Sequence, residues 1–435
     1  MRFIHTIIRQ SFFCVTFLLA IYSELSAKDI LSYPLNKENT HYIKANLVGQ
    51  FWLRYTAMNP GSVYNGYSKQ DGIDIGIRRF RLQMLSQLND RLFFYTQFGL
   101  NNFHSYSDRQ AGFYVMDANS DYALIQDKLS LGAGLSSWVG FSRFSSPAAS
   151  SILGVDAPLQ LQATNDVTDQ FIRRLGVYAK GYLGKLNYRL SMVQPFDIQK
   201  SPIASKVNLS TVSSFSPLPP MMQWNAYLNY EFLEKEQNST PYFAGTYLGQ
   251  KRVSTLGAGI TYQKDALWIL NSKKDTAFHP LVLTSVDYFY EAPLTGKGGV
   301  LNMYFNASYT DFGKKYLRML GAMNPMTGSS DNSILNGGGN RFPAYGTGFS
   351  LYSQVAYKFP KKILKSDFMP YVALQRSYYD ALNLPMNFFE CGFNLLLDGN
   401  NSKVTIGYQN RPVFDHSGEL LSRKGAIALQ MQTAI

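Results

Sequence analysis

The sequence predicts an all-β protein, a transmembrane antiparallel β-barrel of about 16 strands. Side chains alternate with a period of two along many segments, and the connections between those segments fall into a short and a long class. After residue 25, no stretch is long and apolar enough for a membrane helix. Of the 435 residues, 46% are hydrophobic and 16% charged, which excludes a disordered chain because so much apolar surface must be buried.

The N-terminus is expected to direct export. Two arginines, Arg2 and Arg9, precede the apolar run SFFCVTFLLAIY, which is followed by SELSA and the polar KDI. This is the pattern of a secretory signal peptide. We expect residues 1–27 to be that peptide, with cleavage near Ala27, residues 28–41 to be a short periplasmic segment, and residues 42–435 to form the barrel.

The strands are predicted from the alternation, one segment at a time. In YIKANLVGQFWLRY (42–55), an apolar face that includes Phe51 and Leu53 opposes a polar face that includes Gln50 and Arg54. The same split recurs in MQWNAYLNYEF (222–232) and VLNMYFNASYT (300–310). In chain order, the predicted strands are 42–57, 73–88, 91–101, 113–127, 130–141, 171–182, 186–196, 222–234, 252–264, 280–291, 298–311, 346–359, 368–379, 385–397, 402–412 and 424–435.

The connections indicate a membrane barrel. Even-numbered strands are mostly followed by tight turns such as DKLS (127–130), and odd-numbered strands mostly by longer intervals, including 142–170, 265–279, 312–345 and 413–423. Short turns on one rim and long loops on the other are typical of an outer-membrane barrel. An even strand count lets the first and last strands pair, which closes the sheet and satisfies its backbone in lipid. The interval 235–251 departs from the pattern as a long inner-rim connection.

Two other functional classes remain as alternatives to a channel. One is a structural barrel that acts as a scaffold of an envelope or secretion complex, and the other is a surface-binding β protein. Catalysis has little support, because the five His show no metal-binding spacing and no catalytic motif such as G-x-S-x-G is present. We therefore expect no enzyme, no metal site and no cofactor. The net charge of +12 is scattered without a basic run, so no nucleic-acid partner is expected.

Three segments carry a family resemblance: IRRFRLQMLSQLNDRLFFYTQFGLNN (77–102), FIRRLGVYAKGYLGKLNYRLSMVQPF (171–196) and YLGQKRVSTLGAGITYQ (247–263). They resemble the phosphate-selective porin O and P family, in particular its relatives in Bacteroidetes-type outer membranes. The resemblance covers most of the mature chain. It implies a homotrimeric porin in the bacterial outer membrane, with lipid and small hydrophilic solutes or anions as partners and with its third long loop, here 142–170, folded into the lumen.

Charged strand positions are assigned to the lumen, because a charge on the lipid face costs about 2–4 kcal/mol at the bilayer midplane. The basic residues outnumber the acidic ones, which predicts a diffusion channel with a weak preference for anions. The predicted pore-lining residues are Lys44, Arg54, Arg79, Arg81, Arg174, Lys180, Arg189, Asp117 and Asp121. Arg79 and Arg81 form the most concentrated basic group. The equal alternative is that they only pair with acids across the lumen, for which Asp117 and Asp121 are the candidates.

The constriction is expected where loop 142–170 meets the wall that carries Arg79 and Arg81. A sixteen-stranded barrel is too wide for wall side chains alone to fill, so a long inward loop must set the size limit. The charged residues of the loop are Arg143, Asp156, Asp166 and Asp169. This loop lacks the dense basic series on which the phosphate selectivity of the family depends.

Overall fold

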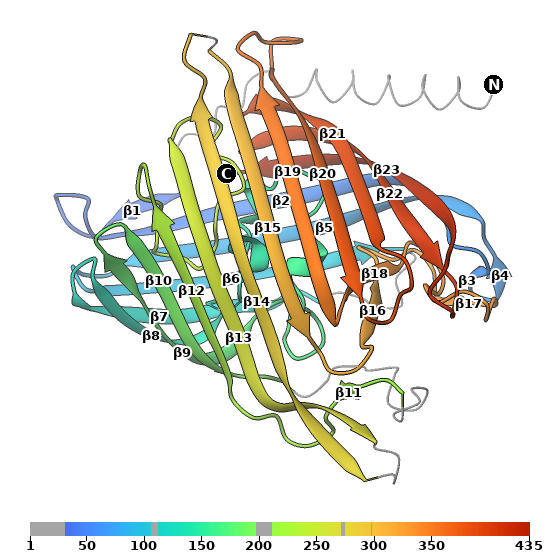
Figure 1. Ribbon diagram of the computed structural model, residues 1–435. Helices are drawn as coiled ribbons and strands as arrows, with labels where there is room; N and C mark the ends of the chain where they lie inside the picture. The colour runs from blue at the N-terminus through green and yellow to red at the C-terminus, as the bar shows by residue number, and fades with distance from the viewer. Residues whose placement is uncertain (1–30, 106–111, 139, 197–210, 271–274, 297) are drawn as a thin grey trace.

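The computed structural model describes residues 31–105, 112–138, 140–196, 211–270, 275–296 and 298–435 (Figure 1). Within these residues the main sheet has 18 strands, and two of them, β1 (Ser32–Pro34) and β11 (Ser214–Phe215), are short additions at the rims. The remaining 16 form a closed antiparallel barrel, because β2 (Tyr42–Ala57) pairs with β23 (Leu420–Ala434). The predicted fold class is therefore confirmed. The predicted signal peptide and its cleavage site lie outside the described residues.

The strands between β2 and β23 follow the predicted order. They are β5 (Asp71–Gln87), β6 (Leu92–His104), β7 (Tyr114–Ile125), β8 (Leu129–Ser136), β9 (Arg174–Leu183), β10 (Leu186–Gln194), β12 (Gln223–Glu231), β13 (Val253–Leu270), β14 (Thr276–Pro293), β15 (Val300–Asp311), β19 (Gly348–Lys358), β20 (Asp367–Tyr379), β21 (Met386–Asp398) and β22 (Ser402–Phe414). The long connections after β2, β8 and β15 leave one rim, termed the long-loop rim. The opposite rim, which carries most of the tight turns, is termed the short-turn rim.

Two of the predicted long connections are wrong. β13 and β14 pair as far as Leu270 and Thr276, beyond a register shift between Gln263 and Leu267, so the predicted interval 265–279 is mostly strand. A bulge of this kind restarts the ladder after a local irregularity, which a strict alternation count interprets as the end of a strand. β22 and β23 likewise pair as far as Phe414 and Leu420, which shortens the predicted interval 413–423.

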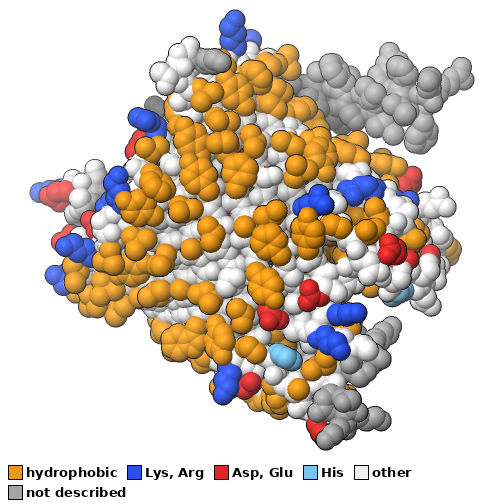
Figure 2. Space-filling model, in the orientation of Figure 1, with side chains coloured by type: hydrophobic (Ala, Val, Ile, Leu, Met, Phe, Trp, Pro, Cys, Tyr) orange, Lys and Arg blue, Asp and Glu red, His pale blue; other side chains and the backbone are white. Residues whose placement is uncertain are grey.

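The outward face of the barrel is apolar, as lipid contact requires. Large hydrophobic side chains on alternate strand positions are exposed there, among them Phe51, Ile75 and Trp224. Figure 2 shows hydrophobic side chains over much of this face, with charged side chains mostly toward its margins. In the described ranges, no helix has the length and apolar character of a membrane span.

The lumen contains folded chain and a hydrophobic core. The connection 312–347 forms β16 (Leu317–Leu320), which pairs with β18 (Phe342–Gly346), and β17 (Gly328–Ser329), which pairs with β3 (Ser62–Tyr64). β3 also pairs with β4 (Tyr67–Ser68). The largest buried cluster joins side chains of this connection to loop and wall residues, including Phe144, Phe312, Tyr345, Phe289 and Tyr304. The open space inside the barrel is therefore limited by these internal segments.

Candidate functional site

A first segment enters the lumen from the long-loop rim. It spans residues 137–173, here called the long-loop insert, and carries three short 3-10 helices, η1 (Arg143–Ser145), η2 (Ala149–Ser151) and η3 (Leu159–Leu161). Its green helical turns are visible inside the barrel in Figure 1. Side chains of β2 and β22, the two neighbours of β23 and not neighbours of β8 or β9, bind its backbone: Gln50 Nε2 donates to Ala149 O (3.0 Å) and Lys403 Nζ donates to Ile152 O (2.6 Å). The insert therefore crosses the lumen.

A second segment enters from the opposite, short-turn rim. Residues 232–252, here called the short-turn insert, connect β12 to β13 and include the interval that departs from the short-turn pattern. Lys180 Nζ donates to Ser239 O (3.0 Å), and Arg189 Nη1 donates to Pro241 O (2.8 Å). The two inserts meet, because Ala148 N donates to Phe243 O at 2.8 Å and Phe243 N donates to Ser146 O at 3.0 Å.

Carboxylates on the barrel strands accept hydrogen bonds from backbone N–H groups of the two inserts. Buried backbone N–H groups need acceptors, and the inserts have little regular structure to supply them. Asp287 accepts from the Arg143 N–H, Glu390 from the Val155 N–H, and Glu291 from the N–H groups of Tyr247 and Gly249, all at 2.8–2.9 Å. These inward acids hold buried backbone in place.

A buried ion pair joins the two inserts. Arg143 of the long-loop insert donates through Nη1 and Nη2 to the two carboxylate oxygens of Glu236, at 2.7 and 2.6 Å. The two side chains are 0% and 1% exposed. Burial disfavours both charges, but Glu236 raises the pKa of Arg143 and Arg143 lowers the pKa of Glu236. The pair therefore stays ionised and fixes one insert to the other.

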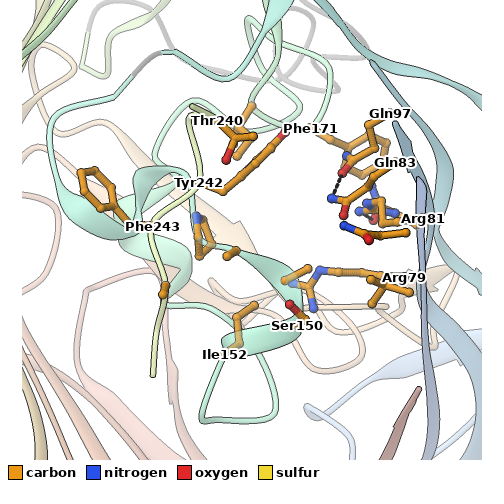
Figure 3. Close-up of a pocket in the computed structure, with 18 of the residues that line it drawn as sticks. Arg79, Arg81, Gln83, Gln97, Ser150, Ile152, Phe171, Thr240, Tyr242 and Phe243 are labelled. Atoms are coloured by element: carbon orange, nitrogen blue, oxygen red, sulfur yellow. Dashed lines mark hydrogen bonds between the residues drawn. The ribbon is translucent and has the colours of Figure 1, made fainter. Parts of the chain in front are cut away.

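A cavity of about 320 Å³ remains between the inserts and the wall formed by β2, β5 and β6. Its lining contains Arg78, Arg79, Arg81 and Arg173, and among its described lining residues there is no Asp or Glu. Figure 3 shows Arg79 and Arg81, with Gln83 and Gln97, on one side of the open space, Tyr242 across from them, and Ser150 beside the end of Arg79. This cavity thus has a positive wall.

A β-bulge supplies one of these arginines. Gln50 pairs with Arg79 but Phe51 pairs with Ile77, so Arg78 is the extra residue of β5. Arg78 and Arg79 are both buried and both bind the Asp156 carboxylate of the long-loop insert. Burial alone would raise the pKa of Asp156, but the two guanidinium groups outweigh it and lower that pKa to about 2. Asp156 therefore remains a carboxylate at neutral pH and offsets one of the two positive charges.

The other two cavity arginines differ in their partners. Arg173 Nε lies 3.3 Å from Asp117 Oδ2, and Arg173 Nη2 donates to Tyr242 Oη at 2.7 Å. Arg81 donates to the carbonyls of Phe80 (2.8 Å) and Leu100 (2.7 Å) and to the side-chain oxygen of Asn101. No carboxylate of the described chain forms an ion pair with Arg81. Arg81 is therefore the cavity arginine without an acidic partner among the described residues.

The other predicted pore residues lie away from this cavity. Three are buried in ion pairs: Arg54 with Asp74 (2.9 Å), Lys180 with Asp121 (2.8 Å) and Arg174 with Asp169 (3.1 Å). The Arg189 guanidinium lies 3.6 Å from the centre of the Phe243 ring. Lys44 is exposed near the start of β2, and the Asp166 N–H donates to Asp169.

The predicted acidic partners of Arg79 and Arg81, which are Asp117 and Asp121, pair instead with Arg173 and Lys180. Register explains this, since Asp121 lies on β7 and reaches Lys180 of β9 across β8.

Solved structures show what kind of barrel this is. OmpF of Salmonella typhi, in a complex with daunomycin, aligns with a TM-score of 0.50 at 8% identity over 92% of this chain and 99% of that chain. The outer membrane channel DcaP of Acinetobacter baumannii aligns with a TM-score of 0.50 at 11% identity over 93% of this chain and 100% of that chain. No family model and no curated protein matches the sequence. At these identities the likeness establishes the fold, and the chain is a closed antiparallel barrel of the porin-like type.

Proposed function

We propose that the protein is an outer-membrane diffusion channel for small hydrophilic solutes, with a weak preference for anions. The arginine-lined cavity carries the proposal. Four guanidinium groups line it. Two carboxylates outside the lining, Asp156 and Asp117, pair with three of these groups, which leaves an excess of two positive charges. A charged constriction selects ions through its local potential, so anions are enriched where the passage is narrowest.

Location and assembly belong to the same proposal. The apolar outward face suits lipid, and the resemblance to the phosphate-selective porin O and P family supports export to the outer membrane and a homotrimer. The proposal does not include a phosphate preference, because the two arginines of the long-loop insert, Arg143 and Arg173, are paired with Glu236 and Asp117. No catalytic step is part of the proposed function.

A scaffold barrel is the second candidate. The observation that favours it is the filled lumen, where two inserts and a hydrophobic core occupy much of the interior. A structural barrel would need this internal packing but no continuous aqueous path.

Planar-bilayer recording of the wild-type protein separates the two candidates. A channel gives stepwise conductance, and in a salt gradient its reversal potential lies on the anion-selective side. The unboiled sample should migrate differently from the boiled one on a gel, which shows that the barrel is folded. A folded barrel that gives no conductance steps would contradict the channel and favour the scaffold.

The orientation of the barrel is tested by labelling. We expect the long-loop rim to face the cell exterior and the short-turn rim to face the periplasm. In a Cys391→Ser background, Ser330→Cys should react with an impermeant thiol reagent in intact cells, whereas Asn401→Cys should react only after lysis. Both positions are exposed, so accessibility to the reagent differs only by side. The reverse labelling pattern would invert the proposed topology.

A further inference from the structure

We infer that the constriction has two sides, and that Tyr242, carried into the lumen by the short-turn insert, sets its smallest cross-section opposite Arg81. The inference rests on the proposed channel function. It assigns the size limit for solutes to a residue of the short-turn insert, which enters the lumen from the rim opposite to that of the long-loop insert.

The lining of the cavity supports this assignment. Gln237, Thr240, Tyr242, Phe243, Ala244 and Tyr247 all line the cavity, so the short-turn insert forms a continuous part of its wall. Figure 3 places Tyr242 across the open space from Arg81 and Gln83. Of the labelled side chains of the short-turn insert, Tyr242 lies closer to Arg81 than Phe243 does, and it is larger than Thr240.

Tyr242 is held by contacts that fix its ring. Its hydroxyl donates to Asp117 Oδ2 at 2.6 Å and accepts from Arg173 Nη2 at 2.7 Å. The ring packs edge-on against Tyr95 of the wall, with a centroid separation of 6.1 Å. A side chain anchored at its tip and packed along its ring has little rotamer freedom, so its ring is a fixed boundary of the passage.

The insert behind Tyr242 is equally fixed. Lys180 and Arg189 bind the carbonyls of Ser239 and Pro241, which lie just before Tyr242. The backbone of Phe243, which follows it, bonds to the long-loop insert in both directions. The barrel wall therefore holds the chain just before Tyr242, and the long-loop insert holds the chain just after it.

Three substitutions at Tyr242 test the inference in planar bilayers. Tyr242→Ala removes the ring and should raise single-channel conductance about 1.5- to 2-fold and admit larger neutral sugars, because the narrowest cross-section limits flow. Tyr242→Trp should lower conductance and the sugar size limit. Tyr242→Phe keeps the ring but removes the hydroxyl, and it should conduct like the wild type if the ring sets the size.

Tyr67→Ala is the matched control, since it removes the same ring from β4, where Tyr67 is 75% exposed and outside the cavity lining. It should leave conductance unchanged. If the wild type conducts but Tyr242→Ala and Tyr242→Trp have wild-type conductance and sugar limits, the inference fails and the channel proposal stands. If neither the folded wild-type protein nor any folded variant conducts, the channel proposal fails and the inference fails with it.

Discussion

Replacing Arg81 by glutamate is expected to abolish or reverse the anion preference that we propose for the channel. Arg81 is the cavity arginine that no described carboxylate neutralises, and its replacement changes the local charge by two units. A unit charge about 4 Å from a permeating ion contributes about 1 kcal/mol in water, so the anion-to-cation preference should change by roughly ten-fold after salt screening. The measurement is the reversal potential in a salt gradient.

Two further variants make this result specific. Arg81→Gln removes the charge without placing a carboxylate beside the carbonyls of Phe80 and Leu100, and it should give an intermediate reversal potential. Arg91→Glu makes the same two-unit change at an exposed site near the short-turn rim and should have little effect. A wild-type reversal potential in both Arg81 variants would mean that the arginine only supports the wall.

Replacing Glu236 by glutamine should release the two inserts from each other. The substitution leaves the Arg143 guanidinium buried without a counter-charge, and breaking a buried pair in this way costs about 3–5 kcal/mol. Because the pair joins segments that enter from opposite rims, its loss should appear as flickering between conductance levels and as faster proteolysis within 232–252. Single-channel records and protease digestion of the folded barrel measure the two effects.

The control for this variant is Glu234→Gln, the same substitution two positions away at an exposed residue. It should behave like the wild type. The double variant Arg143→Met with Glu236→Gln removes both charges and should recover part of the stability, since no unpaired guanidinium remains. Steady single-level conductance in Glu236→Gln would show that the other contacts suffice to hold the inserts.

The barrel could be predicted because the pattern that identifies each strand lies within the sequence of that strand. A period-two alternation in each segment identifies a strand and its inward face without knowledge of any partner, and the predicted first strand, 42–57, matches β2. The same reasoning missed Arg78. A bulge in β5 turns two successive arginines inward, whereas strict alternation assigns only Arg79 to that face. The adjacent pair Arg78-Arg79 was a visible signal, because a lipid-facing arginine within a strand is costly.

The fate of the short-turn insert could not be predicted in the same way. Its length marked it as unusual, but its path depends on Lys180, Arg189 and Glu291, which lie on three different strands. The alternation along a strand predicts that a charged side chain points into the barrel. It does not predict whether that side chain faces water or a buried backbone group. Arg79 and Arg81 face the cavity, whereas Lys180 faces an insert, and that difference exists only in the assembled structure.

The seam between the first and last strands has a consequence for the assembly of the barrel. Gln50 of β2 and Gln432 of β23 are register partners, and their side chains are hydrogen-bonded across the seam at 2.8 Å. The same two amides donate to Ala149 O and Ser150 O at the tip of the long-loop insert. Because the same two side chains hold both the seam and the tip of the insert, we expect closure of the barrel and docking of the insert to stabilise each other.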